Sequence, residues 1–422
     1  SFLALLEEHP ATRNVLLRLF ASSDHLSTLF IRHPEMLDTL VRSDLAHTRR
    51  TRDELRAELH GLIAASADFE ARLDAVRSFR HQEYLRIAIA DLSGNLELEE
   101  LQIELTHLAE TVLSEALALA RAEYASRAAA PPGLALCAVA MGRLGAAEMT
   151  YNSDLDLIFV YHLGGEADGS GHEAAARIVQ KLIAILEVPT REGIAYKIDV
   201  RLRPSGNSGP LVTSLGGFRE YHRHSSAVWE RQALVRARVV AGDAWLWDEV
   251  EQARRDFVFG RGLGSAEVRE IAAMRERMER EIGAETRNRL NLKQGRGGLV
   301  DIEFITQMMA LRHGCAFPEL RRRGTIALIR ALGAARLTPL AEAEALEDDY
   351  RYLTRLENRL RIETDQAAWA LPTRLDQLAP LARRMGYEGA DAPARLLDEL
   401  ERRRARVRAA FDACFARELA SS

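Results

Sequence analysis

Residues 152–161 read Asn-Ser-Asp-Leu-Asp-Leu-Ile-Phe-Val-Tyr, a polar start that runs into an apolar stretch. The apolar run favours a β-strand, in which successive side chains point to opposite faces. Asp154 and Asp156 therefore point the same way, about 7 Å apart along the strand, while Leu155 and Leu157 point into the core. Unpaired carboxylates at the edge of a core repel each other, and a hard divalent cation such as Mg²⁺ removes that conflict. The stretch predicts a metal site.

A third acidic side chain follows on the next predicted strand, residues 197–203. Alternation puts Asp199 on the same face as Lys197, Arg201 and Arg203, and a carboxylate flanked by cations suits a site for phosphate and metal. We expect the two arginines to hold pyrophosphate. Two alternatives stay open: the aspartates end their strands in ordinary turns, where Asp is common, and the arginines form a solvated strand face.

Glycines precede the acidic stretch, in Met141-Gly142-Arg143-Leu144-Gly145. Without a Cβ, Gly142 and Gly145 let backbone N–H groups approach the phosphates of a nucleotide, and Arg143 adds positive charge. The alternative is a simple turn between a strand and a helix.

These motifs come in a recognisable order: glycines, then two aspartates after a short helix, then one more acidic strand. In this order they resemble the nucleotidyltransferase superfamily of the polymerase-β type. Longer blocks make the chain similar to the glutamine synthetase adenylyltransferase family in particular. The blocks that carry this resemblance are residues 142–145, 152–156, 199–211, 229–238 and 292–304.

The resemblance implies an α+β fold class, with a polymerase-β-type nucleotidyltransferase domain that has a mixed sheet and is flanked by N-terminal and C-terminal all-α helical domains. It also implies two Mg²⁺ ions and ATP as substrate. Asp154 and Asp156 would bridge both metals, and Asp199 would hold the metal beside the attacking hydroxyl and accept its proton. The residues expected to bind the nucleotide are Gly142, Arg143, Gly145, Ser153, Arg201, Arg203 and Lys293.

Full-length members of that family carry two halves of this kind. One transfers AMP from ATP to a tyrosine hydroxyl of glutamine synthetase with release of pyrophosphate, and the other removes AMP by phosphorolysis to give ADP. This chain has one copy of each motif, and residues 3–10, 204–206 and 229–234 resemble the C-terminal, adenylylating half. The deadenylylating half is the alternative, and a catalytically silent binding module is the second. The partners implied are glutamine synthetase, the PII signalling protein and glutamine as an effector.

Three positions depart from the family pattern. Arg143 stands where lysine is frequent, Ala146 where a second glycine is usual, and Ala227 where an extra tryptophan is usual. None of them removes a carboxylate, so they bear on nucleotide affinity rather than on activity.

The distribution of glycine and helical periodicity divides the chain. Residues 1–132 hold two of the 27 glycines and repeat apolar residues at the helical period, which returns after about residue 218. At 422 residues the chain is too long for one compact core. We expect a helical domain at 1–130, a nucleotidyltransferase domain at 131–260 and a helical bundle at 261–422.

Composition excludes several classes of protein. The formal net charge is -5 with both signs interleaved, which does not favour nucleic acid. No apolar run reaches the ~18 residues of a membrane span, so we expect a soluble, cytoplasmic protein with no membrane partner. Its opening residue, Ser1 rather than methionine, suggests an excised piece of a longer protein. Three scattered cysteines fit reduced, mostly buried thiols. The nearby polar residues that lack metal-ligand spacing are His162, Asp168 and His172.

Overall fold

The computed structural model describes residues 7–36, 49–164, 170–364 and 369–420. Residues 3–6 of the predicted opening block and Asp168 lie outside these ranges. The chain forms two compact units, each with its own internal contacts. The first comprises Ser1–Ser226 and Ala237–Arg254, and the second Ala227–Arg236 and Arg255–Ser422.

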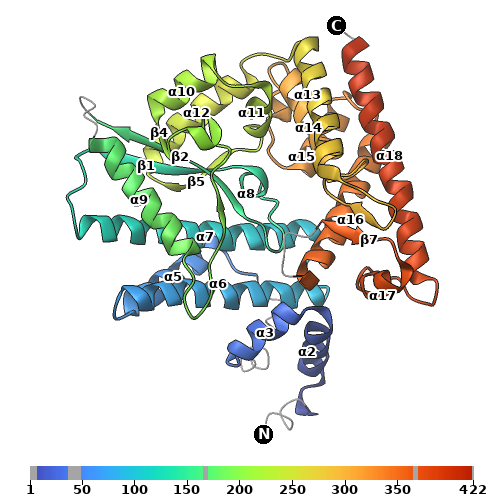
Figure 1. Cartoon of the computed structure of the whole chain (residues 1–422), viewed down its shortest axis with the longest axis horizontal. Helices are drawn as coiled ribbons and strands as arrows, with labels where there is room; N and C mark the ends of the chain where they lie inside the picture. The colour runs from blue at the N-terminus through green and yellow to red at the C-terminus, as the bar shows by residue number, and fades with distance from the viewer. Residues whose placement is uncertain (1–6, 37–48, 165–169, 365–368, 421–422) are drawn as a thin grey trace. The chain divides into compact units, whose positions relative to one another are not determined.

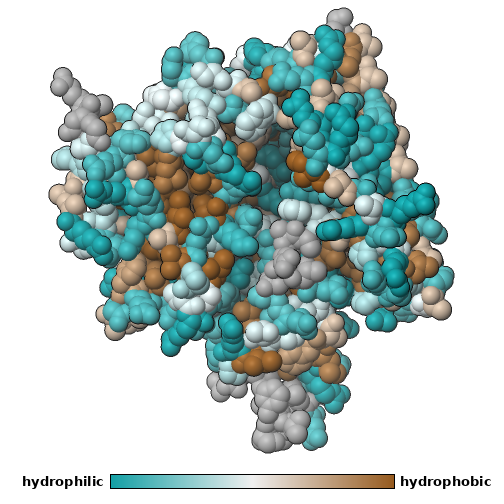
Figure 2. All heavy atoms as spheres, viewed as in Figure 1, coloured by the Kyte–Doolittle hydropathy of each residue, from teal (hydrophilic) through white to brown (hydrophobic). Residues whose placement is uncertain are grey.

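Helices make up 66% of the structure, and the strands form one small mixed sheet and a two-stranded pair. The mostly helical content with a small mixed sheet confirms the α+β class predicted from the sequence. None of the helices in the described ranges is long and apolar enough to cross a membrane. On the face drawn in Figure 2, hydrophilic side chains cover most of the surface and hydrophobic ones gather in limited areas.

The sheet of the first unit is built around β2, which pairs antiparallel with β1 from Leu134↔Leu163 to Ala140↔Leu157. On its other side β2 pairs parallel with both β3 and β4, and β5 joins the outer side of β1 antiparallel (Figure 1). The strands are β1 (Leu134–Ala140), β2 (Leu155–Leu163), β3 (Ile198–Asp199), β4 (Val212–Ser214) and β5 (Arg238–Gly242).

The two central strands are apolar runs, and their burial forms the core of the sheet. Cys137 in β1 is fully buried, and burial raises the pKa of its thiol to about 12, so this cysteine is an inert core residue. Cys414 is also buried and Cys315 is exposed, and all three are free thiols. The expectation of reduced, mostly buried cysteines is therefore confirmed.

The strand predicted over residues 197–203 is wrong beyond Asp199, because β3 contains only Ile198–Asp199. The Asp199 Oδ1 atom accepts a hydrogen bond from the Arg201 N–H at 2.8 Å, which turns the backbone away from the sheet. Arg201 and Arg203 consequently lie in a turn, where strand alternation does not fix their direction.

Long helices support this sheet. α6 and α7 run side by side, α7 packs on α9 and β5, and α9 packs on β1 and β2 (Figure 1). Side chains cap several N-termini, for example Thr51 with Glu54 at α5 and Asp68 at α6. The helices are α2 (Pro10–Ser22), α3 (Asp24–Arg32), α5 (Arg52–Ala65), α6 (Phe69–Leu92), α7 (Leu98–Ala125), α8 (Gly142–Ala146), α9 (Ser170–Glu187), α10 (Leu215–His224) and α12 (Ala244–Phe259), which begins in this unit.

The second unit is helical, with a fully buried ion pair in its core. Arg275 Nε lies 2.5 Å from Asp301 Oδ1, and the other oxygen of Asp301 accepts from the Gly297 N–H. The elements are α11 (Val228–Ala233), α13 (Ser265–Met278), η2 (Glu279–Gly283), β6 (Arg289–Asn291), α14 (Leu299–His313), η3 (Pro318–Leu320), α15 (Thr325–Ala334), α16 (Leu340–Thr364), β7 (Ala370–Pro372), α17 (Leu375–Arg384) and α18 (Ala392–Ala420).

Asp243 joins β1, β5 and α7 in the first unit. Its carboxylate accepts hydrogen bonds from Arg121 Nη2 at 2.6 Å and from the Leu136 N–H at 2.8 Å. Partial burial raises the pKa of Asp243, but the bonds from Arg121 and Leu136 outweigh it and leave the pKa lowered. The ionised form is therefore the one that stabilises the fold.

We predict that Asp243→Asn lowers the free energy of unfolding by about 1 kcal/mol at pH 7, a modest value because the pair is partly exposed. A lowered native pKa stabilises above the unfolded value of about 3.9, and this stability is lost as pH falls through the native pKa. Urea unfolding from pH 7 to pH 3 should show the deficit shrinking, whereas exposed Asp248→Asn changes little. A deficit independent of pH would contradict this account.

Candidate active site

The three predicted carboxylates meet at one edge of the sheet in the first unit. Asp156 in β2 stands directly opposite Asp199 in β3 in the parallel register. Partners in register on neighbouring strands, about 4.8 Å apart, project to the same face. Asp154 is two residues before Asp156 and immediately before β2, at an exposed position. The two strands thus bring the carboxylates together from sequence positions 45 residues apart or less.

Arg201 is the cation among these carboxylates. Its Nε and Nη2 atoms donate to Asp199 Oδ2 at 2.8 and 2.5 Å, and its side chain is 74% exposed. The pKa of Arg201 is raised, first by the hydrogen bonds to Asp199 and also by the charges of Asp156 and Asp154. All three carboxylates therefore act on one cation.

The same contacts keep Asp199 ionised. Hydrogen bonds from the Arg201 side chain are the largest cause that lowers the pKa of Asp199. A carboxylate held in its charged form is a suitable ligand for a hard cation and a weak acceptor of protons.

Gly142 is the closest neighbour of the Asp156 carboxylate from the glycine motif. Its φ of +52° is one that side chains rarely adopt, and a Cβ built there would overlap Asp156 Oδ2. The Met141 N–H donates to the Asp156 carbonyl at 2.8 Å, which fixes this approach. The absence of a side chain at Gly142 therefore makes room for the Asp156 carboxylate itself, and a carboxylate beside Asp199 is a ligand type that suits a hard cation.

Arg143 and Ser153 brace the loop that leads into Asp154. Arg143 Nη1 donates to Thr150 Oγ1 at 2.5 Å, and Thr150 Oγ1 is hydrogen bonded to Ser153 Oγ at 2.9 Å. Ser153 Oγ also accepts from the Thr150 N–H at 3.3 Å. Arg143 and Ser153, both predicted to bind the nucleotide, are thus hydrogen bonded to Thr150 in this structure.

Helix α6 anchors the same loop through two tyrosines that sequence reasoning did not single out. Tyr84 donates to Asn152 Oδ1 at 3.0 Å, and Tyr151 donates to Asp91 Oδ2 at 2.8 Å in a buried contact. Asn152 has a φ of +53°, which the bond from Tyr84 helps to hold. No local pattern could have revealed these contacts, because the paired residues are 60 or more positions apart.

Gly145 and Arg203 have contacts that shape the backbone. The carbonyls of Leu144 and Gly145 accept hydrogen bonds from Arg238, which also pairs with Glu110 in α7. Arg203 donates to the carbonyls of Val200, Asn207 and Gly209, so its guanidinium closes the loop after Asp199.

Lys293 belongs to the second unit. Its ammonium nitrogen lies 4.7 Å from the centre of the Trp369 ring, and the Trp369 indole N–H donates to Glu357 Oε1 at 2.8 Å. This is a cation–π contact, and the Lys293 N–H also donates to Asn291 Oδ1 at 3.1 Å.

One group of three metal-binding side chains lies elsewhere in the described ranges. It consists of His33, His81 and Glu192, whose ligand atoms lie within 4.8 Å of one another. The carboxylate oxygens of Asp154, Asp156 and Asp199 do not all lie within 4.8 Å of one another. The Asp199 carboxylate is instead paired with Arg201. The histidines that are near the acidic stretch in sequence pack on aromatic rings, His162 on Trp245 and His172 on Tyr161.

Comparison with known proteins gives the family. A model of the glutamate-ammonia ligase adenylyltransferase family matches residues 13–253, more than half of the 422-residue chain. The chain belongs to this family. A second family model, PII-uridylyltransferase, matches residues 269–415.

Curated relatives agree with this assignment. Each of the following is named bifunctional glutamine synthetase adenylyltransferase/adenylyl-removing enzyme. The protein of Chromobacterium violaceum is 38% identical, with 86% of this chain and 40% of the relative covered. That of Hahella chejuensis is 35% identical, with 87% and 41% covered, and that of Thioalkalivibrio sulfidiphilus is 33% identical, with 95% and 42% covered. The chain therefore spans about two fifths of the length of these relatives.

We predict that Gly142→Ala destabilises the protein by about 1–3 kcal/mol, because alanine is strained at this positive φ and its methyl group displaces the Asp156 carboxylate. Urea unfolding measures this. The matched control is Gly216→Ala in α10, where a Cβ has open space and the change should be neutral or slightly stabilising. Equal stability of Gly142→Ala and the parent would show that the close approach to Asp156 is not a constraint.

Proposed function

We propose that this chain is a metal-dependent nucleotidyltransferase that transfers AMP from ATP to a tyrosine hydroxyl of glutamine synthetase, with release of pyrophosphate. The observation that carries the proposal is the register of Asp156 with Asp199. These residues lie beside Gly142, a position where any side chain would overlap the Asp156 carboxylate. The names of the relatives and the family match support the choice of target.

In this proposal Asp154, Asp156 and Asp199 hold two Mg²⁺ ions. When bound, the ions lower the pKa of the attacking hydroxyl and neutralise charge on the leaving pyrophosphate. Asp154 and Asp156 would supply carboxylate ligands to these ions, as the family resemblance implies. The lowered pKa of Asp199 favours its role as a ligand over that of proton acceptor.

Arg201 supplies a mobile positive charge. Its exposed side chain is paired with Asp199, and it would exchange that partner for the pyrophosphate once the carboxylates hold metal. Arg203 contributes by closing the loop that carries Arg201, since its guanidinium donates to three backbone carbonyls. Gly142, Gly145, Arg143, Ser153 and Lys293 remain predicted nucleotide contacts.

The assignment to the adenylylating half rests on the local sequence at residues 204–206 and 229–234. We also propose the domain order predicted from the sequence, which has a nucleotidyltransferase domain at 131–260 between helical domains at 1–130 and 261–422. A cytoplasmic location, the PII protein as a partner and glutamine as an effector follow from the family resemblance.

The test of function is incubation of the chain with glutamine synthetase, Mg²⁺ and ATP labelled in the α-phosphate. We expect label on the synthetase, and none when a chelator removes Mg²⁺. Release of ADP from adenylylated synthetase by added phosphate, without labelling, would select the deadenylylating reaction instead. Inactivity in both directions would select the silent binding module.

We predict that Asp154→Asn and Asp156→Asn each reduce labelling by at least about 10³-fold, because each removes a charged metal ligand. The control is Asp248→Asn, an exposed aspartate in α12, which should retain full activity. Initial rates at saturating ATP, with unfolding curves to verify the fold, provide the measurement. Undiminished rates in either site variant would rule out the metal assignment.

A further inference from the structure

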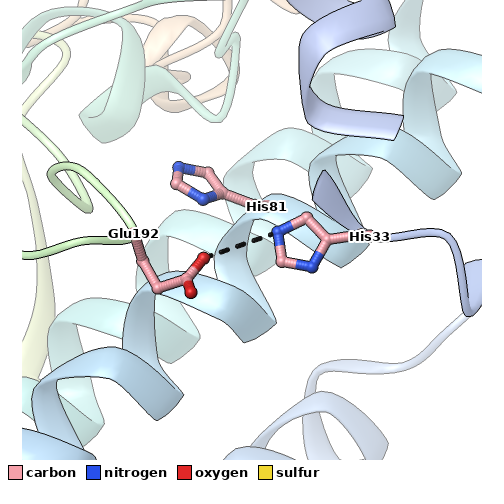
Figure 3. Close-up of side chains that lie close together, drawn as sticks. All are labelled: His33, His81 and Glu192. Carbon is pink, nitrogen blue, oxygen red and sulfur yellow. Dashed lines mark ion pairs between the residues drawn. The ribbon is translucent and has the colours of Figure 1, made fainter. Parts of the chain in front are cut away.

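A second group of metal-binding side chains converges in the first unit. His33 follows α3, His81 lies on α6, and Glu192 lies in the turn between α9 and β3 (Figure 3). One ligand atom from each lies within 4.8 Å of the other two, and both histidines are more than nine-tenths buried. These residues come from three separate parts of the chain, and none belongs to the carboxylate site.

His33 presents an unsatisfied nitrogen to this group. Its Nδ1 lies 3.1 Å from Glu35 Oε1, and in the neutral ring with the proton on Nδ1 a lone pair is left on Nε2. That Nε2 is buried without a hydrogen-bond partner and faces Glu192 Oε2 at 3.7 Å, which exceeds the about 2.7–3.2 Å of an N–H···O bond. A cation held between this lone pair and the carboxylate oxygen would bind to both of them.

His81 provides the second imidazole. Its buried ring lies on α6, with one ring nitrogen within 4.8 Å of the ligand atoms of His33 and Glu192. A histidine binds a metal through the lone pair of a ring nitrogen. The opposite oxygen of Glu192, Oε1, lies 3.7 Å from Arg191 Nε, so Oε2 remains directed at the histidines.

The scaffold around these ligands is fixed by Arg77, one helical turn before His81. Arg77 donates to the Gly193 carbonyl at 2.8 Å and to the Ile185 carbonyl at 2.9 Å, which fastens the turn that carries Glu192 to α6. The backbone of Gly193 lies against His81, since a Cβ built there would be 4.0 Å from the ring. Ligands on so constrained a frame lose little entropy on binding.

We propose that His33, His81 and Glu192 bind one Zn²⁺ ion, with water as the fourth ligand. Two imidazoles and a carboxylate form a ligand set that suits zinc, whereas Mg²⁺ prefers oxygen atoms alone. Bonds of about 2.0–2.2 Å in a tetrahedron place ligand atoms about 3.3–3.6 Å apart, close to the 3.7 Å between His33 Nε2 and Glu192 Oε2. Glu35 orients His33 as carboxylates orient metal-binding histidines, and Gln82 holds Glu35 at 3.0 Å.

The test is zinc titration of the whole chelator-treated chain by calorimetry, with bound zinc counted after desalting. We expect one tightly bound Zn²⁺ per chain and a higher Tm. Glu192→Gln and His33→Gln should each weaken binding at least about 100-fold, and Glu35→Gln about 10–100-fold through loss of orientation. Co²⁺ in place of zinc should give the visible absorption of a four-coordinate site in the parent but not in Glu192→Gln or His33→Gln.

Two controls isolate this site. His224→Gln removes an exposed histidine and should bind zinc as the parent does. Asp156→Asn should also bind zinc normally, which separates the site from the carboxylates of the proposed transferase. Circular dichroism verifies that Glu192→Gln, whose altered side chain is partly exposed, is folded. Absence of tight zinc binding in the parent, or equal binding by the folded Glu192→Gln variant, would overturn the proposal.

Discussion

The parallel pairing of two residues, Ile198 and Asp199, with β2 is the contact on which the carboxylate site depends. So short a strand has little stability of its own. Its position is secured at the entrance, where the Leu155 N–H donates to the Lys197 carbonyl at 2.9 Å and the Ile198 N–H donates to Glu187 at 2.7 Å. A slip of one residue would turn Asp199 to the opposite face and separate it from Asp156.

Helix α6 braces both acidic segments, although it contributes none of the carboxylates. Buried Arg77 binds carbonyls on either side of the turn before β3, while Tyr84 and Asp91 hold the loop before Asp154. Burial lowers the pKa of Arg77, and its backbone hydrogen bonds offset part of the cost of desolvation. One helix thus holds both the turn before β3 and the loop before Asp154.

Local patterns in the sequence predicted the part of the site that local geometry controls. Alternation along residues 154–161 predicted β2, whereas Gly142, the first residue of α8, was predicted to approach phosphates, and its close approach to Asp156 emerged only from the structure. The prediction failed beyond Asp199, because a side-chain bond to the Arg201 N–H replaced the next strand pairing. The α6 anchors and the His33, His81 and Glu192 group could not be predicted, since tertiary packing brings together residues far apart in the chain.

The division of the chain into two units follows the division between the two family matches except at residues 227–236, which lie in the first match but belong to the second unit. The adenylyltransferase match covers 13–253 and the uridylyltransferase match 269–415, while the contacts divide at Arg254 and Arg255. Each unit also has its own buried charges, Arg77 with backbone carbonyls in the first and Arg275 with Asp301 in the second. The strand pairing of Asp156 with Asp199, the close approach of Gly142 and the ion pair of Arg201 with Asp199 all join residues of the first unit, so the core of that unit sets this geometry.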